Sequence, residues 1–258
     1  MADHEADGRQ GGLAPPDAPA TPAPDPGSAE HGSAEHGPDR FDDPDSLETG
    51  RLLFARPAKF VMGVVKLDQL PPAATPEVAF AGRSNVGKSS LINALVNQHG
   101  LARTSNTPGR TQEINLFDLS GRLTLVDLPG YGFAQAPLEK VKAWTGLVFA
   151  YLRGRPNLTR VCLLIDARRG VMPVDLEVME MLGKAAVPFA AVLTKRDRLK
   201  PSERAALEAE LAASLTRRAA ALPFQFSTSS KEREGIDLLR ASLAKLALPA
   251  EPDRSRES

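Results

Sequence analysis

The stretch VAFAGRSNVGKSSLINAL, residues 78–95, decides the fold of this 258-residue chain. An apolar run leads into a glycine-containing loop, and a helical pattern begins at Lys88. The loop matches GxxxxGK[ST] between a strand and a helix, the context of a phosphate-binding P-loop. Its backbone N–H groups and the helix N-terminus should face phosphate oxygens. The predicted loop residues are Gly82, Arg83, Ser84, Asn85, Val86, Gly87, Lys88 and Ser89.

Within this loop, two side chains have predicted tasks. We expect Lys88 to reach the β- and γ-phosphates and the hydroxyl of Ser89 to bind Mg²⁺. The pattern arises by chance in roughly one chain in a hundred of this length, and the correct flanks make chance less frequent still.

Apolar runs alternate with helical patterns along the middle of the chain, as a parallel sheet with crossover helices requires. We expect strands at residues 60–66, 78–81, 114–119, 123–127, 161–165, 189–194 and 224–226, and helices at 88–97, 138–152, 174–182, 202–220 and 236–246. Residues 118–122 join two strands too closely for a helix, so that pair should be an antiparallel hairpin. The predicted fold is an α/β three-layer P-loop NTPase sandwich, with a mostly parallel sheet, one antiparallel edge pair and helices on both faces.

The segment Asp127-Leu128-Pro129-Gly130 ends the strand after the hairpin, 38 residues beyond Ser89. In a P-loop NTPase a carboxylate at this place holds Mg²⁺ through water, and we expect the Gly130 amide to sense the γ-phosphate. A lone DxxG is more often a simple turn, so its position carries the interpretation.

The segment Thr194-Lys195-Arg196-Asp197 follows an apolar strand and matches [NT]KxD. A carboxylate at Asp197 can accept two hydrogen bonds from guanine, whereas adenine offers no such paired donors. Lys195 should lay its aliphatic stem over the base. Taken alone the tetrapeptide could be an exposed loop, but after a P-loop and a DxxG it predicts guanine recognition.

The run Ser227-Thr228-Ser229-Ser230 lies at the end of the last predicted strand. A backbone N–H here can contact the guanine carbonyl, since small residues allow close approach. We expect Thr228, Ser229 and Ser230 to contact the nucleotide, with Ser229 and Ser230 favoured for the carbonyl contact.

The polar loop of residues 104–112 lies between the first predicted helix and the next strand. Such loops can be ordered by the γ-phosphate and Mg²⁺. Thr111 and Thr107 are the two candidates for a second Mg²⁺ ligand, because loop length cannot be fixed from the sequence.

Composition separates a folded part from two tails. Residues 1–50 hold 8 of the 22 prolines and a GSAEHGSAEHG repeat, a composition typical of disorder. We expect an acidic tail over 1–50, a GTPase domain over 51–248 and a short tail over 249–258. Residues 1–50 hold 2 Lys+Arg against 12 Asp+Glu, whereas residues 51–250 hold 28 against 17, a net charge of +11. This excess suggests a polyanionic partner, although solvated surface charge is the plainer reading.

The compartment follows from what the chain does not contain. No apolar stretch approaches the roughly 20 residues that cross a bilayer, and no secretory signal segment opens the chain. The single cysteine, Cys162, excludes a disulfide framework. We expect a cytoplasmic protein that works as a monomer.

Four segments make the pattern family-specific: GRSNVGKSSLINAL, SNTPGRTQEIN, DLPGYGFA and TKRD. Together they resemble the EngB (YihA/YsxC) branch of the TrmE-Era-EngA-EngB-septin GTPases, over about residues 51–248. The resemblance implies a bacterial GTPase needed for assembly of the large (50S) ribosomal subunit, with its rRNA as partner, and for normal division septation. It also favours Thr111 over Thr107 as the Mg²⁺ ligand. Nucleotide contacts are expected at Gly109, Arg110, Thr111, Gln112 and Glu113.

The catalytic group is expected to be Lys88, Thr111 and Gly130. Many GTPases orient the attacking water with a glutamine directly after DxxG, but here that position is Tyr131. Intrinsic hydrolysis of GTP to GDP should therefore be slow, with stimulation from an assembly partner or a cation. By resemblance to the wider class Asn85 could bind K⁺ near the phosphates; the alternative is a loop asparagine that hydrogen-bonds only to backbone.

Two other classes of protein share the phosphate loop. A P-loop ATPase or small-molecule kinase would need a different base-reading element, and the TKRD segment argues against it. A scaffold in which GTP is purely structural is disfavoured by Lys88, Ser89, Asp127 and Thr111 together.

Overall fold

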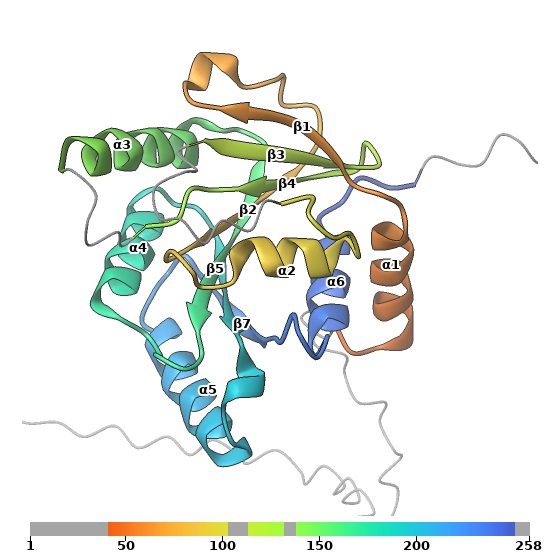
Figure 1. Cartoon of the computed structure of the whole chain (residues 1–258), viewed down its shortest axis with the longest axis vertical. Coiled ribbons are helices and arrows are strands. Elements are labelled where there is room, and N and C mark those ends of the chain that lie inside the picture. The colour runs from red at the N-terminus through yellow and green to blue at the C-terminus, as the bar shows by residue number, and fades with distance from the viewer. Residues whose placement is uncertain (1–40, 103–112, 132–137, 251–258) are drawn as a thin grey trace, which may run out of the picture. The chain divides into compact units, whose positions relative to one another are not determined.

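The computed structural model describes residues 41–102, 113–131 and 138–250, all of which belong to one compact unit, Pro38–Ser258. Its centre is a seven-stranded sheet in the order β1-β3-β4-β2-β5-β6-β7 (Figure 1). The strands are β1 (Lys59–Val64), β2 (Glu77–Gly82), β3 (Ile114–Leu119), β4 (Leu123–Asp127), β5 (Leu158–Asp166), β6 (Phe189–Thr194) and β7 (Ala221–Ser227). The predicted α/β sandwich is confirmed.

Four of the six strand pairings in the sheet are parallel, and two are antiparallel. β2 pairs in parallel with β4 and β5, and β6 pairs in parallel with β5 and β7. β3 and β4 form the predicted antiparallel hairpin, and β1 adds a second antiparallel pairing on the other side of β3. The parallel strands therefore end at the same edge of the sheet, where the P-loop and the TKRD segment lie.

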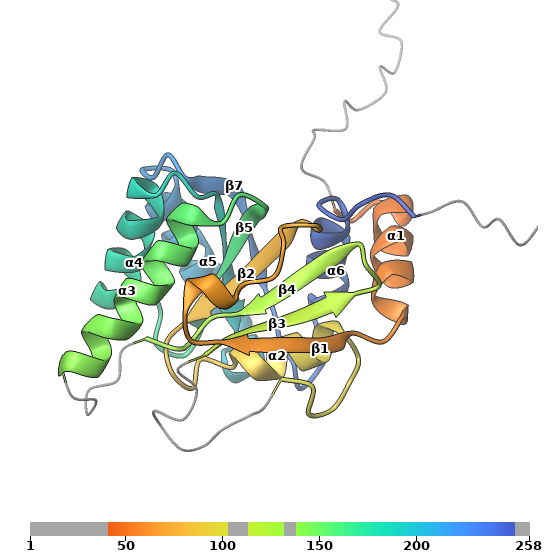
Figure 2. The same cartoon turned by 90° about the horizontal axis from the view of Figure 1, so that it is seen from above.

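The helices form two layers, one on each face of the sheet (Figure 2). They are α1 (Pro44–Ala55), α2 (Lys88–Leu95), α3 (Leu138–Gly154), α4 (Pro173–Lys184), α5 (Pro201–Leu215) and α6 (Ile236–Ala244), with short 3₁₀ turns at Leu67–Gln69 and Arg196–Arg198. One core contains residues of α1, α2 and α6, and the other contains residues of α3, α4 and α5.

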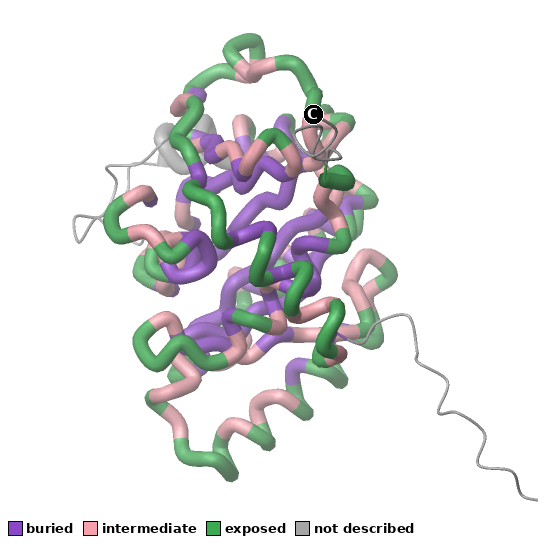
Figure 3. The backbone as a smooth tube through the Cα atoms, turned by 90° about the vertical axis from the view of Figure 1, so that its right-hand side faces the viewer, coloured by how far each residue is buried: buried purple, intermediate pink, exposed green. Residues whose placement is uncertain are grey.

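The strands β2 to β6 supply both cores because successive side chains point to opposite faces. On β2, Val78 and Phe80 belong to the core under α2 and α6, whereas Ala79 and Ala81 belong to the other. All six residues of β2 and of β6 are buried, as expected for strands covered on both sides. Figure 3 shows buried backbone running through the interior.

Helix α1 corrects the predicted domain boundary at residue 50, because the helix begins at Pro44 and runs across it. Asp43 caps its N-terminus by accepting a 2.8 Å hydrogen bond from the Ser46 amide. Before the helix, Phe41 is buried, and its ring lies 4.9 Å from that of Phe224 on β7. The folded domain therefore includes residues 41–50, and only residues 1–40 fall outside the description at this end.

Helix α1 packs closely against α6. A Cβ atom added at Gly50 would lie 2.6 Å from the backbone nitrogen of Ala241, so only glycine allows this approach. Among the helices of the described ranges, none is long and apolar enough to cross a membrane.

Candidate nucleotide-binding site

The loop predicted to bind phosphate joins β2 to α2, as the sequence indicated. Asn85 and Gly87 both have positive φ, at 62° and 106°, which curls the loop backbone before the helix begins at Lys88. Val86 points inward and is buried in the core, so it anchors the loop. The first amides of α2 lie at the end of this curl, a geometry that suits an anion.

The side chain of Lys88 forms an ion pair with Asp127, which ends β4. Both side chains are largely buried, with 12% and 7% of their area exposed. The pair joins the P-loop to the DLPG segment, because β4 lies directly beside β2 in the sheet. Two of the predicted phosphate-site motifs are thus in direct contact.

The DLPG segment is held against the P-loop by backbone hydrogen bonds. The Leu128 amide donates to the carbonyl of Phe80, and Leu128 itself is buried. Two residues beyond Pro129, the Tyr131 amide donates to the Gly82 carbonyl, and the Ser84 amide donates to the Tyr131 carbonyl. Gly130 is therefore placed beside the loop, where the sequence predicted a sensor of the γ-phosphate.

The TKRD segment is also tied to the P-loop. The hydroxyl of Thr194 donates to the carbonyl of Val86 at 2.7 Å. The Lys195 Nζ donates to the carbonyl of Asn85 at 2.6 Å and to Oδ2 of Asp166 at 2.9 Å. These bonds hold the Lys195 side chain against the P-loop, with its Cε atom 3.5 Å from where a Cβ atom at Gly87 would lie.

Asp166 ends β5 and was not singled out in the sequence, although a charged residue at the carboxyl end of a buried parallel strand is a readable signal. Burial would raise the pKa of its carboxyl. Hydrogen bonds from Arg168 and Lys195 outweigh this effect and lower the pKa to about 2. The carboxylate therefore stays charged and holds Lys195 in place.

Asp197, the predicted guanine reader, is oriented by Ser229. The Ser229 hydroxyl donates to Oδ1 of Asp197 at 2.7 Å, and Arg198 lies 3.4 Å from the other carboxylate oxygen. The hydrogen bond from Ser229 is the main reason that the pKa of Asp197 lies below its usual value. An ionised carboxylate is the form that can accept two hydrogen bonds from a base.

Two of the three backbone amides in the segment of residues 228–230 are already hydrogen-bonded within the protein. The Thr228 amide and hydroxyl both donate to the carbonyl of Leu193, and the Ser229 amide donates to the carbonyl of Glu234. Thr228 is fully buried, so it fixes the strand end rather than facing the ligand as predicted. Ser230 lines the pocket and is the remaining candidate for the backbone contact.

Arg196 also differs from the prediction. Its guanidinium donates to the carbonyl of Ser227 at 3.3 Å and lies 3.2 Å from a carboxylate oxygen of Glu234. The side chain thus ties the TKRD turn to the segment after β7, outside the pocket lining.

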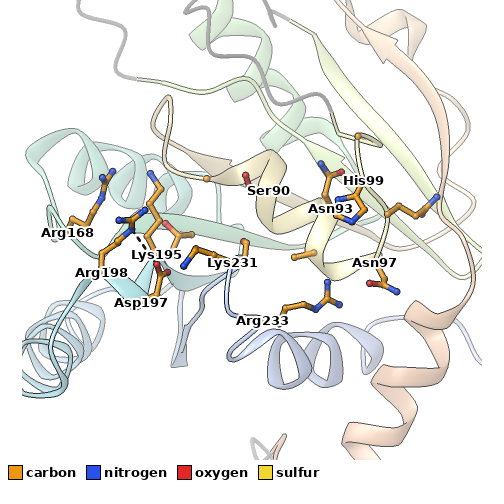
Figure 4. Close-up of a pocket in the computed structure, with 16 residues that line it drawn as sticks. Ser90, Asn93, Asn97, His99, Arg168, Lys195, Asp197, Arg198, Lys231 and Arg233 are labelled. Carbon is orange, nitrogen blue, oxygen red and sulfur yellow. Dashed lines mark ion pairs between the residues drawn. The ribbon is translucent and has the colours of Figure 1, made fainter.

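A pocket of about 580 Å³ lies between the TKRD segment, the turn at residues 230–233 and α2, and Gly87 is the one predicted phosphate-loop residue in its described lining. Figure 4 shows Lys195 and Asp197 on one side and Ser90 and Asn93 of α2 across from them. Asn93 was missed by the sequence analysis, yet its amide exchanges two hydrogen bonds with the backbone of Ala102. It therefore fixes the entrance to the loop predicted to carry Thr111.

Gly109, Arg110, Thr111 and Gln112 lie outside the described residues, whereas Glu113 is exposed directly before β3. Within the described ranges, no group of three or more His, Cys, Asp or Glu side chains could hold a metal alone. The hydroxyl of Ser89 is a hard oxygen donor, which suits Mg²⁺ with waters and phosphate oxygens among its other ligands, and the carboxylate of Asp127 can accept a hydrogen bond from such a water.

The chain is similar to several known GTP-binding proteins. Residues 77–195 match the family model described as a 50S ribosome-binding GTPase. A probable GTP-binding protein EngB of Rhodospirillum rubrum is 56% identical over 209 residues, covering 79% of this chain and 90% of the relative. The corresponding protein of Gluconobacter oxydans is 52% identical over 212 residues, covering 82% of this chain and 93% of the relative.

Two solved structures support the fold. The crystal structure of a probable GTP-binding protein EngB has a TM-score of 0.54 at 24% identity, covering 66% of this chain and 97% of that one. Era in complex with MgGDPNP and nucleotides of 16S ribosomal RNA has a TM-score of 0.54 at 20% identity, covering 72% and 61%. With relatives above 50% identity over nearly their full length, the chain belongs to the EngB family of GTP-binding proteins and is a GTPase.

Proposed function

We propose that this GTPase is a switch in the assembly of the large (50S) ribosomal subunit. In this proposal the GTP-bound form docks on rRNA of a maturing subunit, hydrolysis promotes release, and cells lacking the protein also fail in normal division septation. The family model, described as a 50S ribosome-binding GTPase, carries the proposal. The net charge of +11 over residues 51–250 supports an RNA partner. A ribosomal partner places the protein in the cytoplasm, where we propose that it works as a monomer.

Phosphate binding is assigned to the loop and to the start of α2. The positive φ angles at Asn85 and Gly87 turn the backbone so that amides can face the phosphates, and the N-terminus of α2 adds its dipole. Lys88, now paired with Asp127, would exchange part of that contact for phosphate oxygens. Mg²⁺ bound by the hydroxyls of Ser89 and Thr111 would neutralise the charge that develops during phosphoryl transfer.

Guanine recognition is assigned to Asp197 and Ser230. The carboxylate of Asp197, oriented by Ser229, accepts hydrogen bonds from the ring N–H and amino group of the base. The Ser230 amide donates to the guanine carbonyl, since the amides of Thr228 and Ser229 are already bonded within the protein. The stem of Lys195, held between Asn85 and Asp166, covers the face of the base.

Slow intrinsic hydrolysis is expected because Tyr131 cannot replace a water-orienting glutamine. The Tyr131 side chain is buried, and its hydroxyl already donates to Asp175 at 2.9 Å. An assembly partner or a cation would therefore supply the stimulation. K⁺ at Asn85 remains a prediction: GTP turnover should be faster in K⁺ than in Na⁺, and identical rates, with and without ribosomal particles, would remove the cation role.

Docking is tested by co-sedimentation with 50S particles and their precursors. Wild-type protein should pellet with a non-hydrolysable GTP analogue and not with GDP, and pelleting should weaken as salt rises. Equal pelleting with both nucleotides would defeat the switch model.

The Asp197→Asn variant gives a matched control for nucleotide dependence. An amide can donate to the carbonyl that xanthine presents where guanine has its amino group, so preference should move to xanthine nucleotides. This variant should pellet with a xanthosine triphosphate analogue and not with the GTP analogue. Pelleting without either nucleotide would show that bulk charge alone drives the association.

A further inference from the structure

A buried carboxylate on the first turn of α4 connects three parts of the protein. Asp175 has no exposed surface, and its Oδ1 accepts the 2.9 Å hydrogen bond from the Tyr131 hydroxyl. The same oxygen lies 3.3 Å from Nε of Arg83, which belongs to the P-loop. Its other oxygen accepts a 3.0 Å hydrogen bond from the Met172 amide at the start of α4. We call Arg83, Tyr131 and Asp175 the buried triad.

The charges of this triad are stabilised by one another. A carboxylate in the first helical turn is favoured by the helix dipole, and the guanidinium of Arg83 adds an opposite charge. Burial and the charge of Asp175 raise the pKa of Tyr131 far above its usual value, so its hydroxyl stays a donor. Removing one member would leave the others buried with a lost partner, which is costly.

The triad acts next to the predicted γ-phosphate sensor. Tyr131 directly follows Gly130, and its backbone bonds to Gly82 and Ser84 already join it to the P-loop. A Cβ atom added at Gly130 would lie 3.1 Å from Oγ and 3.2 Å from the amide nitrogen of Ser84, so this glycine packs directly on the loop. The side chain of Tyr131 is the next anchor, and Asp175 holds it.

We propose that Tyr131 and Asp175 are positioning residues, which fix the Gly130 amide for the γ-phosphate and make the start of α4 respond to the bound nucleotide. GDP has no γ-phosphate, so the triad should affect GTP binding and leave GDP binding nearly unchanged. The inference rests on the Gly130 role proposed above and is independent of the ribosomal partner.

The chain contains a matched control for the key substitution. Tyr151 is also buried, and its hydroxyl donates at 2.7 Å to Glu77, which Arg155 contacts at 2.5 Å. This second tyrosine, carboxylate and arginine set has the same chemistry but lies where β2 begins, at the opposite end of that strand from the P-loop. Tyr131→Phe and Tyr151→Phe therefore remove the same bond in two places.

The experiment measures the dissociation constants of GDP and of a non-hydrolysable GTP analogue for both variants and the wild type, with Mg²⁺ and without ribosomes. Tyr131→Phe should weaken GTP-analogue binding relative to GDP by about fivefold or more, the lower end of typical coupling between sites. Tyr151→Phe should leave the ratio of the two constants unchanged. Asp175→Asn, which keeps the side-chain shape and removes the charge, should change the ratio as Tyr131→Phe does.

One further variant and one further measurement make the result decisive. Gly130→Ala should lower GTP-analogue binding by perturbing the sensor itself. If Gly130→Ala changes the ratio while Tyr131→Phe and Asp175→Asn do not, the triad is only structural and the inference fails. If Gly130→Ala also has no effect, the assigned sensor is wrong and the proposed mechanism fails first. Thermal unfolding without nucleotide distinguishes a general loss of stability from a change in nucleotide preference. Both tyrosine variants should lose stability, but only Tyr131→Phe should change the preference.

Discussion

Replacing Ser229 with alanine would remove one buried hydroxyl beside the base pocket and the two hydrogen bonds that it makes. That hydroxyl donates to Oδ1 of Asp197 at 2.7 Å and accepts from the Glu232 amide at 3.1 Å. Ser229 is fully buried, whereas the side chain of Asp197 is 14% exposed and faces the pocket. The substitution therefore tests how far a neighbouring residue sets the orientation of the carboxylate.

The size of the effect follows from the bond that is lost. A hydrogen bond to a charged group contributes about 1.5–3 kcal/mol. This bond is already present in the nucleotide-free protein, so its loss changes the free energy of binding only by disordering the carboxylate. We expect that change to be about 1 kcal/mol. That amount corresponds to about a fivefold weaker affinity for both GDP and GTP.

The pH dependence should move in a defined direction. The bond from Ser229 is the main cause that lowers the pKa of Asp197, so the variant should have a higher pKa. Guanine binding needs the ionised carboxylate, is present above this pKa and is lost as the pH falls through it. The loss should therefore begin at higher pH in Ser229→Ala than in the wild type.

Fluorescent GDP titrations from pH 7 downward would measure both effects. Ser230→Ala is the matched control, since it removes a neighbouring hydroxyl from the pocket lining but keeps the backbone amide assigned to guanine. It should bind GDP like the wild type. Wild-type affinity in Ser229→Ala, or an equal loss in Ser230→Ala, would refute the reasoning.

Three other predictions concern stability, reactivity and the N-terminal segment. Gly50→Ala should lower the free energy of unfolding by about 1–3 kcal/mol, because its Cβ would press on the backbone of Ala241. Gly146→Ala should not destabilise the protein, because, apart from neighbouring residues of its own helix, no atom of the described residues lies within 4 Å of a Cβ built there. Thermal unfolding of the two variants compares them. Burial raises the pKa of Cys162 to about 12, so native protein at pH 8 should resist thiol reagents and react only in denaturant; equally fast reaction in both would contradict this. Removing residues 1–40 deletes 8 acidic and 2 basic residues but keeps α1, so RNA affinity at low salt should rise; an unchanged affinity would show that this segment does not shield the basic domain.

The sheet could be predicted because its strands are buried on both faces and appear as short apolar runs between turn residues. Helix ends were harder to predict. The helix predicted to reach residue 97 ends at Leu95, because Asn97 adopts a positive φ of 53° and the Gln98 amide closes the end by bonding to Asn93. The helix predicted to reach residue 220 ends at Leu215, since the chain must turn to enter β7.

Helix α1 was missed because average composition was applied across a boundary. Residues 41–50 were grouped with a proline-rich segment, although Asp43-Pro44 followed by Ser46 is a readable helix start. The apolar residues Leu53 and Phe54 of this helix are buried against α6, a contact made across nearly two hundred residues of sequence. Local patterns cannot report such a partner.

At the candidate site, the spacing of residues predicted the motifs, but it did not predict which side chains hydrogen-bond to one another. The ion pair between Lys88 and Asp127 could have been predicted from the sequence, because the two residues follow or end adjacent strands. Asp166 was also within reach, since it ends a buried parallel strand. The partners Asp175 and Asn93 were not, because each is an ordinary polar residue whose role depends on what lies opposite in space. The inward turn of Thr228 likewise depends on the register of β7 against β6.

The packing of α1 on α6 has a consequence for how the chain matures during translation. The N-terminal helix cannot bury Leu53 and Phe54 until the C-terminal helix has left the ribosome. The last described residues are also fastened late, since the Leu248 amide donates to the carbonyl of Arg122 in the hairpin turn. Completion of this domain thus waits until α6 has been synthesised, and a nascent chain stopped before Ile236 would expose an apolar surface that the finished domain conceals.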